Sequence, residues 1–124
     1  MASVEGNEAG PADVVAFAVE RVRIDEEDGL CLISGADDEE EPAGYFIIQI
    51  DVVGASLEFL SEELSQRDGV QALAISNRRL DFALDPSSAI GAQMPKVRIT
   101  SREAIGSAVK AALKKAFGNR VREI

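Results

Sequence analysis

The chain has 124 residues, 46% hydrophobic and 28% charged, with a formal net charge of −9 at pH 7. This composition argues against global disorder, and the length predicts one domain. The absence of histidine excludes imidazole general-base catalysis and histidine-ligated zinc. No apolar run reaches the roughly 18 residues of a membrane span, and no signal-peptide pattern is present. A single cysteine fits a reducing compartment, so we expect a cytoplasmic protein.

Acidic residues are concentrated in one part of the chain. No basic residue lies between Arg23 and Arg67, whereas 13 of the 22 acidic residues do. The 58 residues from Arg67 onward carry eleven basic and five acidic residues, a net charge of +6. Concentrated negative charge repels nucleic acid and lipid phosphate and attracts basic proteins. We therefore expect a protein partner, and neither nucleic acid nor a membrane.

The N-terminal part predicts a disordered tail followed by the first strand of the domain. Residues 1–12 are small and polar, and we place them outside the fold. Val14–Ile24 is rich in β-branched residues, and its alternation slips near Glu20, which indicates a bulge or a switch between strands. The acidic cluster 25–28, followed by Gly29, is typical of a hairpin turn.

Two further strands flank the second acidic cluster. The residues 30–33 predict a strand, the loop 37–44 follows it, and 45–50 predict another strand. This last strand is apolar almost throughout, so we expect it to be central in its sheet and buried on both faces. The next segment, 57–64, is ambiguous, because its leucines fit helical spacing after Ser56 but also fit a strand.

The C-terminal half predicts a hairpin, a last strand and a helix. The hairpin joins 70–76 to the strictly alternating 80–84, and the last strand covers 97–99. Thr100 to Glu103 has the spacing of a capping box, and Gly118 is placed as a C-terminal cap. Between them is an apolar stripe at helical spacing, formed by Ile105, Ala108, Val109, Ala112, Leu113, Ala116 and Phe117.

Together these elements predict an α+β fold. We expect a mainly antiparallel β-sheet of about six strands, with the C-terminal amphipathic helix packed on one face. The domain covers residues 13–118, and 119–124 form a C-terminal tail.

No motif in the sequence favours catalysis or metal binding. Cys31 lies in an apolar strand, which predicts a buried core residue rather than a nucleophile. Clustered acids in turns are usually solvated, and the 25–29 cluster lacks the alternate-position spacing of an EF-hand loop. We expect a non-catalytic protein without a metal or cofactor.

The segment from Gly35 to Gln49 carries a specific resemblance. It combines Ala-Asp-Asp-Glu, an acidic residue before Pro42, and Tyr45-Phe-Ile-Ile-Gln. This pattern resembles the immunity protein 10 family, small cytoplasmic bacterial proteins that protect against polymorphic toxins. The similarity extends more weakly over most of residues 17–118, but the leucine- and glutamate-rich stretch 57–68 departs from the family's glycine-rich loop. The resemblance favours a strand over a helix at the start of this stretch.

The resemblance implies an immunity protein that binds a cognate toxin, such as a nuclease, and occludes its active site. An acidic inhibitor can mimic the nucleic-acid backbone in a basic substrate cleft. The predicted partner-binding residues are Asp37, Asp38, Glu39, Glu40, Glu41 and Tyr45, with Asp25, Glu26 and Glu27 on the neighbouring turn. The two clusters flank one strand at its opposite ends, so they need not form one patch. Because the resemblance attaches to the second cluster, we expect the loop from Asp37 to Tyr45 to be the contact.

A second class of protein fits the same sequence. Chaperones of secreted effectors are also small, acidic, α+β and non-catalytic, and they act as homodimers. A chaperone should expose apolar grooves and a symmetric interface, whereas an immunity protein should bind through charged loops. The sequence leaves open whether the chain is a monomer or a homodimer.

Overall fold

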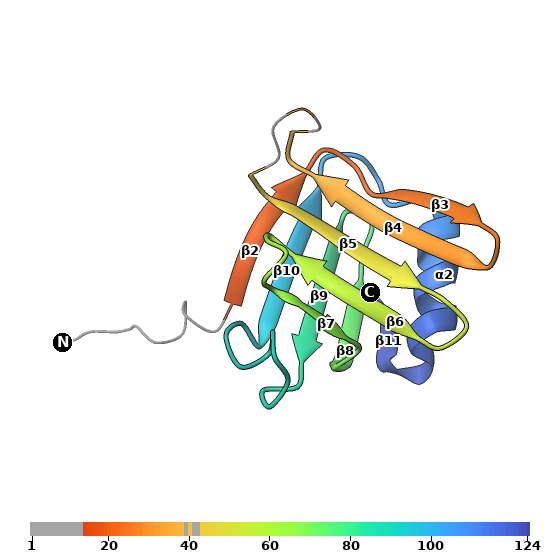
Figure 1. The fold of residues 1–124 in the computed structure, drawn as a ribbon. Helices are drawn as coiled ribbons and strands as arrows, with labels where there is room; N and C mark the ends of the chain where they lie inside the picture. Colours follow the sequence, from red (N-terminus) through yellow and green to blue (C-terminus); the bar gives the residue numbers. More distant parts are fainter. Residues whose placement is uncertain (1–13, 39, 41–42) are drawn as a thin grey trace.

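A computed structural model describes residues 14–38, 40 and 43–124 of the chain, and the predicted tail 1–12 lies outside these residues. Among the described residues, two five-stranded sheets form separate layers, with one α-helix beside them (Figure 1). In spatial order, one sheet contains β3 (Arg23–Glu27), β4 (Leu30–Ala36), β5 (Tyr45–Ile50), β6 (Ala55–Phe59) and β7 (Ser65–Arg67). The other contains β11 (Val121–Glu123), β8 (Val70–Ile75), β9 (Arg79–Leu84), β10 (Lys96–Ser101) and β2 (Val14–Val19).

The expected α+β class and mainly antiparallel pairing are confirmed, but the strand count is ten among the described residues rather than about six. Pairing is antiparallel except between β10 and β2 and between β11 and β8. Two of the additional strands, β7 and β11, were not predicted because of their length. The three-residue strands β7 and β11 are too short to show a periodicity in sequence.

The slip near Glu20 is a switch between sheets. The strand β2 ends at Val19 in one sheet, and β3 begins at Arg23 in the other. Gly35 is packed against this crossing, because a Cβ there would lie 2.8 Å from the Arg21 carbonyl oxygen and 2.9 Å from the Phe46 ring. Glycine therefore permits the close approach of β4 to the connection.

The core fills the space between the sheets. Strands β5 and β6 bury alternate residues against β9 and β10, and the rings of Phe59 and Phe82 meet edge to face with centroids 5.4 Å apart. The strand β5 is central in its sheet, as predicted, but the expectation that both its faces are buried is wrong. Phe46 and Ile48 point inward, whereas Gln49 is exposed. The start of the ambiguous segment, 57–59, belongs to β6, so the strand alternative is correct there.

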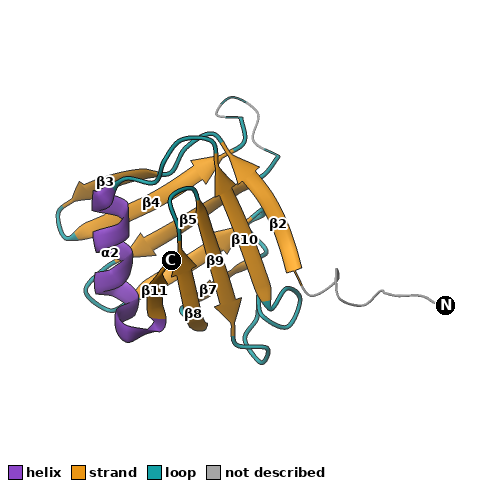
Figure 2. Ribbon diagram, turned by 180° about the vertical axis from the view of Figure 1, so that it is seen from behind, coloured by secondary structure: helices purple, strands orange, loops and turns teal. Residues whose placement is uncertain are grey.

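The helix α2 (Ser107–Phe117) closes one side of the sandwich (Figure 2). It lies beside β3 and β11, the edge strands of the two sheets, rather than across one sheet face. Val109, Leu113 and Phe117 enter the core.

The predicted capping box is wrong, although the predicted cap at Gly118 is confirmed. Thr100 and Ser101 continue β10, and the helix begins only after Gly106, without a side-chain cap. The parallel pairing of Ser101 with Val19 extends the strand and overrides the local capping preference.

The residues placed in a C-terminal tail are ordered into elements. The 3-10 turn η1 (Gly118–Arg120) leads into β11, which pairs with β8. No helix in the described part of the chain is both long and apolar enough to cross a membrane.

Candidate protein-binding surfaces

The loop between β4 and β5 is closed at its neck by Asp37 and Gly44. The Asp37 amide donates to the Gly44 carbonyl at 2.8 Å, and the Ala43 amide donates to the Asp37 carboxylate at 3.0 Å. Hydrogen bonds from backbone amides, led by Gly44, hold the pKa of Asp37 below its ordinary value. Asp37 is exposed. Its hydrogen bonds nevertheless show that its main role is to shape the loop.

Beyond this neck the loop presents acidic side chains to solvent. Asp38 and Glu40 are exposed, and the Glu40 amide donates to the Asp38 carboxylate at 2.9 Å. The predicted contacts Glu39 and Glu41 lie outside the described residues. The described acids of the loop are thus exposed and joined by a local hydrogen bond.

Tyr45 lies next to this loop on the outer face of its sheet. It alternates with the buried Phe46 and is itself half-buried. Its hydroxyl donates to the Glu58 carboxylate at 2.5 Å, a bond that raises the pKa of Tyr45 to about 12, with smaller contributions from burial and from the charges of Glu58 and Glu62. The phenol is held neutral and fixed in place.

Glu58 and Glu62 were not among the residues predicted from sequence. They lie far from Asp37 along the chain, but β6 pairs with β5, and the Leu60 amide donates to the Tyr45 carbonyl at 2.9 Å. We call Tyr45 with Asp37, Asp38, Glu40, Glu58 and Glu62 the acidic face. Only strand pairing brings these groups to one end of the sheet, so no local sequence signal identifies the set.

The other predicted cluster lies elsewhere. Asp25, Glu26 and Glu27 belong to β3 rather than to a turn, and the turn itself is Asp28-Gly29, both with positive φ. Two consecutive positive φ angles are typical of a tight hairpin. Since β4 has seven residues and a strand rises about 3.4 Å per residue, about 20 Å separates this turn from the acidic face. The two clusters therefore do not form one patch, in agreement with the expectation (Figure 1).

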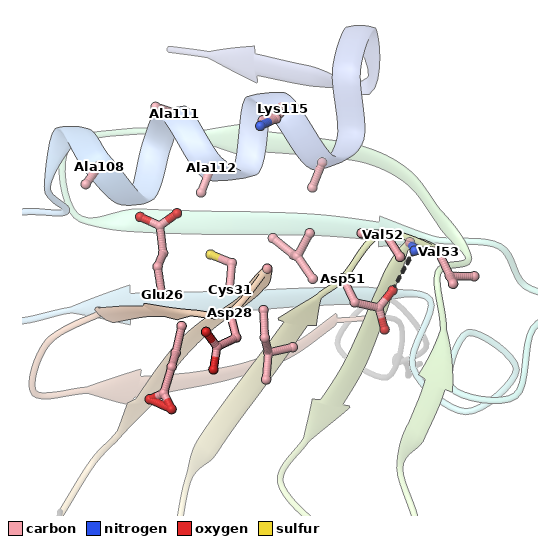
Figure 3. A pocket seen from close by; sticks show the side chains of 16 residues that line it. Glu26, Asp28, Cys31, Asp51, Val52, Val53, Ala108, Ala111, Ala112 and Lys115 are labelled. Carbon is pink, nitrogen blue, oxygen red and sulfur yellow. Dashed lines mark hydrogen bonds between the residues drawn. The ribbon is translucent and has the colours of Figure 1, made fainter.

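One hollow is a groove that the sequence did not indicate (Figure 3). It has a volume of about 870 Å³ and lies between α2, the β3–β4 hairpin and the β5–β6 turn. Its walls are largely small or apolar, and include Ala108, Ala112, Leu30, Val52 and Val53. Cys31 also lines it, half-buried rather than buried as predicted, and burial followed by the nearby charge of Glu26 raises its pKa.

A smaller cleft of about 420 Å³ lies beside the neck of the acidic loop. Two of its carboxylates face arginines, with Glu103 3.9 Å from Arg21 and Glu20 3.6 Å from Arg102. Such pairing gives a surface ion-pair network rather than convergent catalytic carboxylates. Among residues 14–38, 40 and 43–124, no cluster of three or more acidic or cysteine side chains could hold a metal ion.

No protein-family model matches the chain, and no curated protein matches it significantly. The resemblance to the immunity protein 10 family stays a prediction.

Proposed function

We propose that this protein binds a basic partner protein through the acidic face and does so without chemistry of its own. The main support for this proposal is the closed neck at Asp37 and Gly44. Beyond the neck Asp38 and Glu40 are exposed, and the neighbouring ring of Tyr45 is fixed by its hydrogen bond to Glu58. An aromatic side chain surrounded by like charges suits a partner that offers Lys or Arg around an apolar contact.

The partner class that fits best is a bacterial toxin with a basic substrate cleft, such as a nuclease. The resemblance of the segment 35–49 to immunity proteins supports this class. Binding would occlude the cleft, and charge complementarity would raise the association rate by roughly 10- to 1,000-fold at low salt. Asp37 acts here as a positioning residue, whereas Asp38 and Glu40 make contact.

The test uses the protein encoded immediately upstream as the candidate toxin. Glu40→Lys should slow association on the order of tenfold at low salt and weaken protection in co-expression. Asp25→Lys makes the same charge change on β3, where Asp25 pairs with Leu32, outside the acidic face, and is the matched control. Equal effects of the two variants, or an unaffected Glu40→Lys protein, would show that the acidic face is not the contact.

The groove favours the second candidate, a homodimeric chaperone for a secreted effector, because that class should expose apolar grooves. Sedimentation analysis separates the two candidates. A stable symmetric dimer and co-purification with an effector would support the chaperone, whereas a monomer that protects against a toxin would support the immunity protein.

A further inference from the structure

The groove beside α2 is an unpartnered apolar surface with a charged rim. The helix buries Val109, Leu113 and Phe117, while Ala108, Ala112 and Ala116 line the groove at intervals of four residues. Methyl side chains in such a row leave room for another backbone to approach closely. The helix therefore offers a smooth floor along about two turns.

The opposite wall supplies larger apolar side chains. Val52 and Val53 lie at the tip of the β5–β6 turn, with 96% and 76% of their surfaces exposed, and Leu30 is 38% exposed. The turn is held by Asp51, whose carboxylate accepts hydrogen bonds from the amides of Val53 and Gly54 at 2.8 and 3.0 Å. A defined turn that holds two valines in water indicates a contact surface.

The charged residues around the edge of the groove, its rim, indicate what kind of ligand, the occupant, the groove would bind. Glu26, Glu27 and Asp28 line the groove, and Lys115 is the single base among the lining residues. Asp51 lines it too, but its carboxylate lies 3.5 Å from Arg67, so the excess negative charge comes from the β3–β4 hairpin. Glu26 extends between β3 and the helix, beside Cys31 (Figure 3). An occupant needs an apolar stripe for the floor and basic residues for the rim.

The N-terminal segment of this chain does not have that chemistry. Residues 1–13 contain Glu5, Glu8 and Asp13 but no basic residue. By contrast, an amphipathic helix with Lys or Arg beside its apolar stripe matches both walls and rim. Two turns of helix about 10 Å across occupy roughly 850 Å³, comparable to the groove.

We propose that this groove is a second binding site, which takes a basic amphipathic helix of a partner protein. The helix packs its apolar face, with anchors at i, i+3, i+4 and i+7, between the alanines of α2 and the valines of the β5–β6 turn. Its basic residues pair with the acidic rim. The site lies about 20 Å from the acidic face, beyond the Debye length of about 8 Å at physiological salt, so it does not rest on the proposed function.

The test uses the full chain and a synthetic peptide of about 18 residues, with leucines at that spacing and lysines on the other face. A second peptide has the same composition with the leucines dispersed. The first should bind in about 150 mM salt and slow maleimide labelling of Cys31, the only cysteine, about tenfold. No binding, equal binding of both peptides, or unprotected Cys31 would overturn the proposal.

Two variants locate the binding. Ala112→Arg places a cation in the floor and should weaken binding at least tenfold, whereas Ala104→Arg, an exposed position outside the groove, is the matched control. Val53→Asp, at a solvent-exposed turn position, keeps the test valid if Ala112→Arg does not fold. It adds negative charge but removes an apolar contact, so binding should weaken. Tighter binding would show a purely electrostatic attraction and overturn the proposal.

The remaining alternative is that a second copy of this chain occupies the groove. Sedimentation of the native protein and of Val53→Asp decides this point. A monomer in both cases is expected. A native dimer that Val53→Asp dissociates would mean that the groove is a self-interface, which overturns the proposal.

Discussion

At the scale of single residues, acidic side chains in this protein have different tasks. Asp37 and Asp51 accept backbone hydrogen bonds that close turns, whereas Asp38 and Glu40 are exposed beyond the neck of their loop, where the Asp38 carboxylate accepts the Glu40 amide. Glu58 holds the hydroxyl of Tyr45. Sequence position alone gives no means of separating these roles, because the hydrogen-bond partner decides them.

Tyr45 provides a direct measurement at this scale, since it is the only tyrosine and the chain has no tryptophan. Its ultraviolet absorbance should titrate with a pKa of about 12, because the hydroxyl donates to Glu58. A folded-state pKa raised above the unfolded value near 10 stabilises the protein below pH 10, and this contribution is lost as the pH rises toward 12. Glu58→Gln should bring the titration back toward pH 10. Titration of the native protein near 10 would contradict the hydrogen bond.

At the scale of elements, the C-terminal end of α2 is anchored by Arg120. Its guanidinium donates to the Val70 carbonyl at 2.7 Å and to the Asp68 carboxylate at 2.9 Å, and it lies over the Phe117 ring. These contacts join η1 to the turn before β8. They explain why a predicted tail is part of the fold.

Removing this anchor should destabilise the helix. We expect Arg120→Ala to lower the free energy of unfolding by about 1–2 kcal/mol, a modest figure because the pair is partly exposed and screened by solvent. Arg122→Ala, exposed on β11, is the control and should change it by less than about 0.5 kcal/mol. Urea denaturation measures both. Equal losses would mean that the contacts of Arg120 contribute nothing specific.

At the scale of the whole molecule, the strand switch after β2 and the pairing of β5 with β6 place the two proposed binding surfaces at opposite ends of β4. The sandwich keeps its core between the sheets, so both ends are free to carry loops (Figures 1 and 2). Each surface can therefore be changed without altering the other.

Carboxyl groups spread over the whole molecule predict how its stability depends on pH. Hydrogen bonds hold the pKa values of four carboxyl groups below their ordinary values: Asp37, Asp51, Asp85 and Glu123. At Asp68 burial raises the pKa, but the hydrogen bonds that its carboxylate accepts from Arg120 and Val70 lower the pKa by more. A lowered folded-state pKa stabilises the protein above the unfolded value near 4, and this contribution is lost as the pH falls below it. The urea concentration at the midpoint of unfolding should therefore decrease as the pH is lowered below about 4. Asp68→Asn should flatten this fall, and an unchanged slope would contradict the role of Asp68.

The sequence by itself determined the fold class, the strand 45–50, the hairpins and the glycine that ends the helix. These features follow from local alternation and backbone preference, which act over a few residues. It also located the acidic loop, because the charges are consecutive. It did not locate the start of α2, since the pairing of Ser101 with Val19 is not local.

Only the tertiary structure decided which residues share a surface. Glu58 joins Tyr45 through strand pairing, and the groove exists because α2 lies beside the β3–β4 hairpin, far from it in sequence. Such sets depend on where separate elements meet, which is set by packing between sheets rather than by any segment's own pattern.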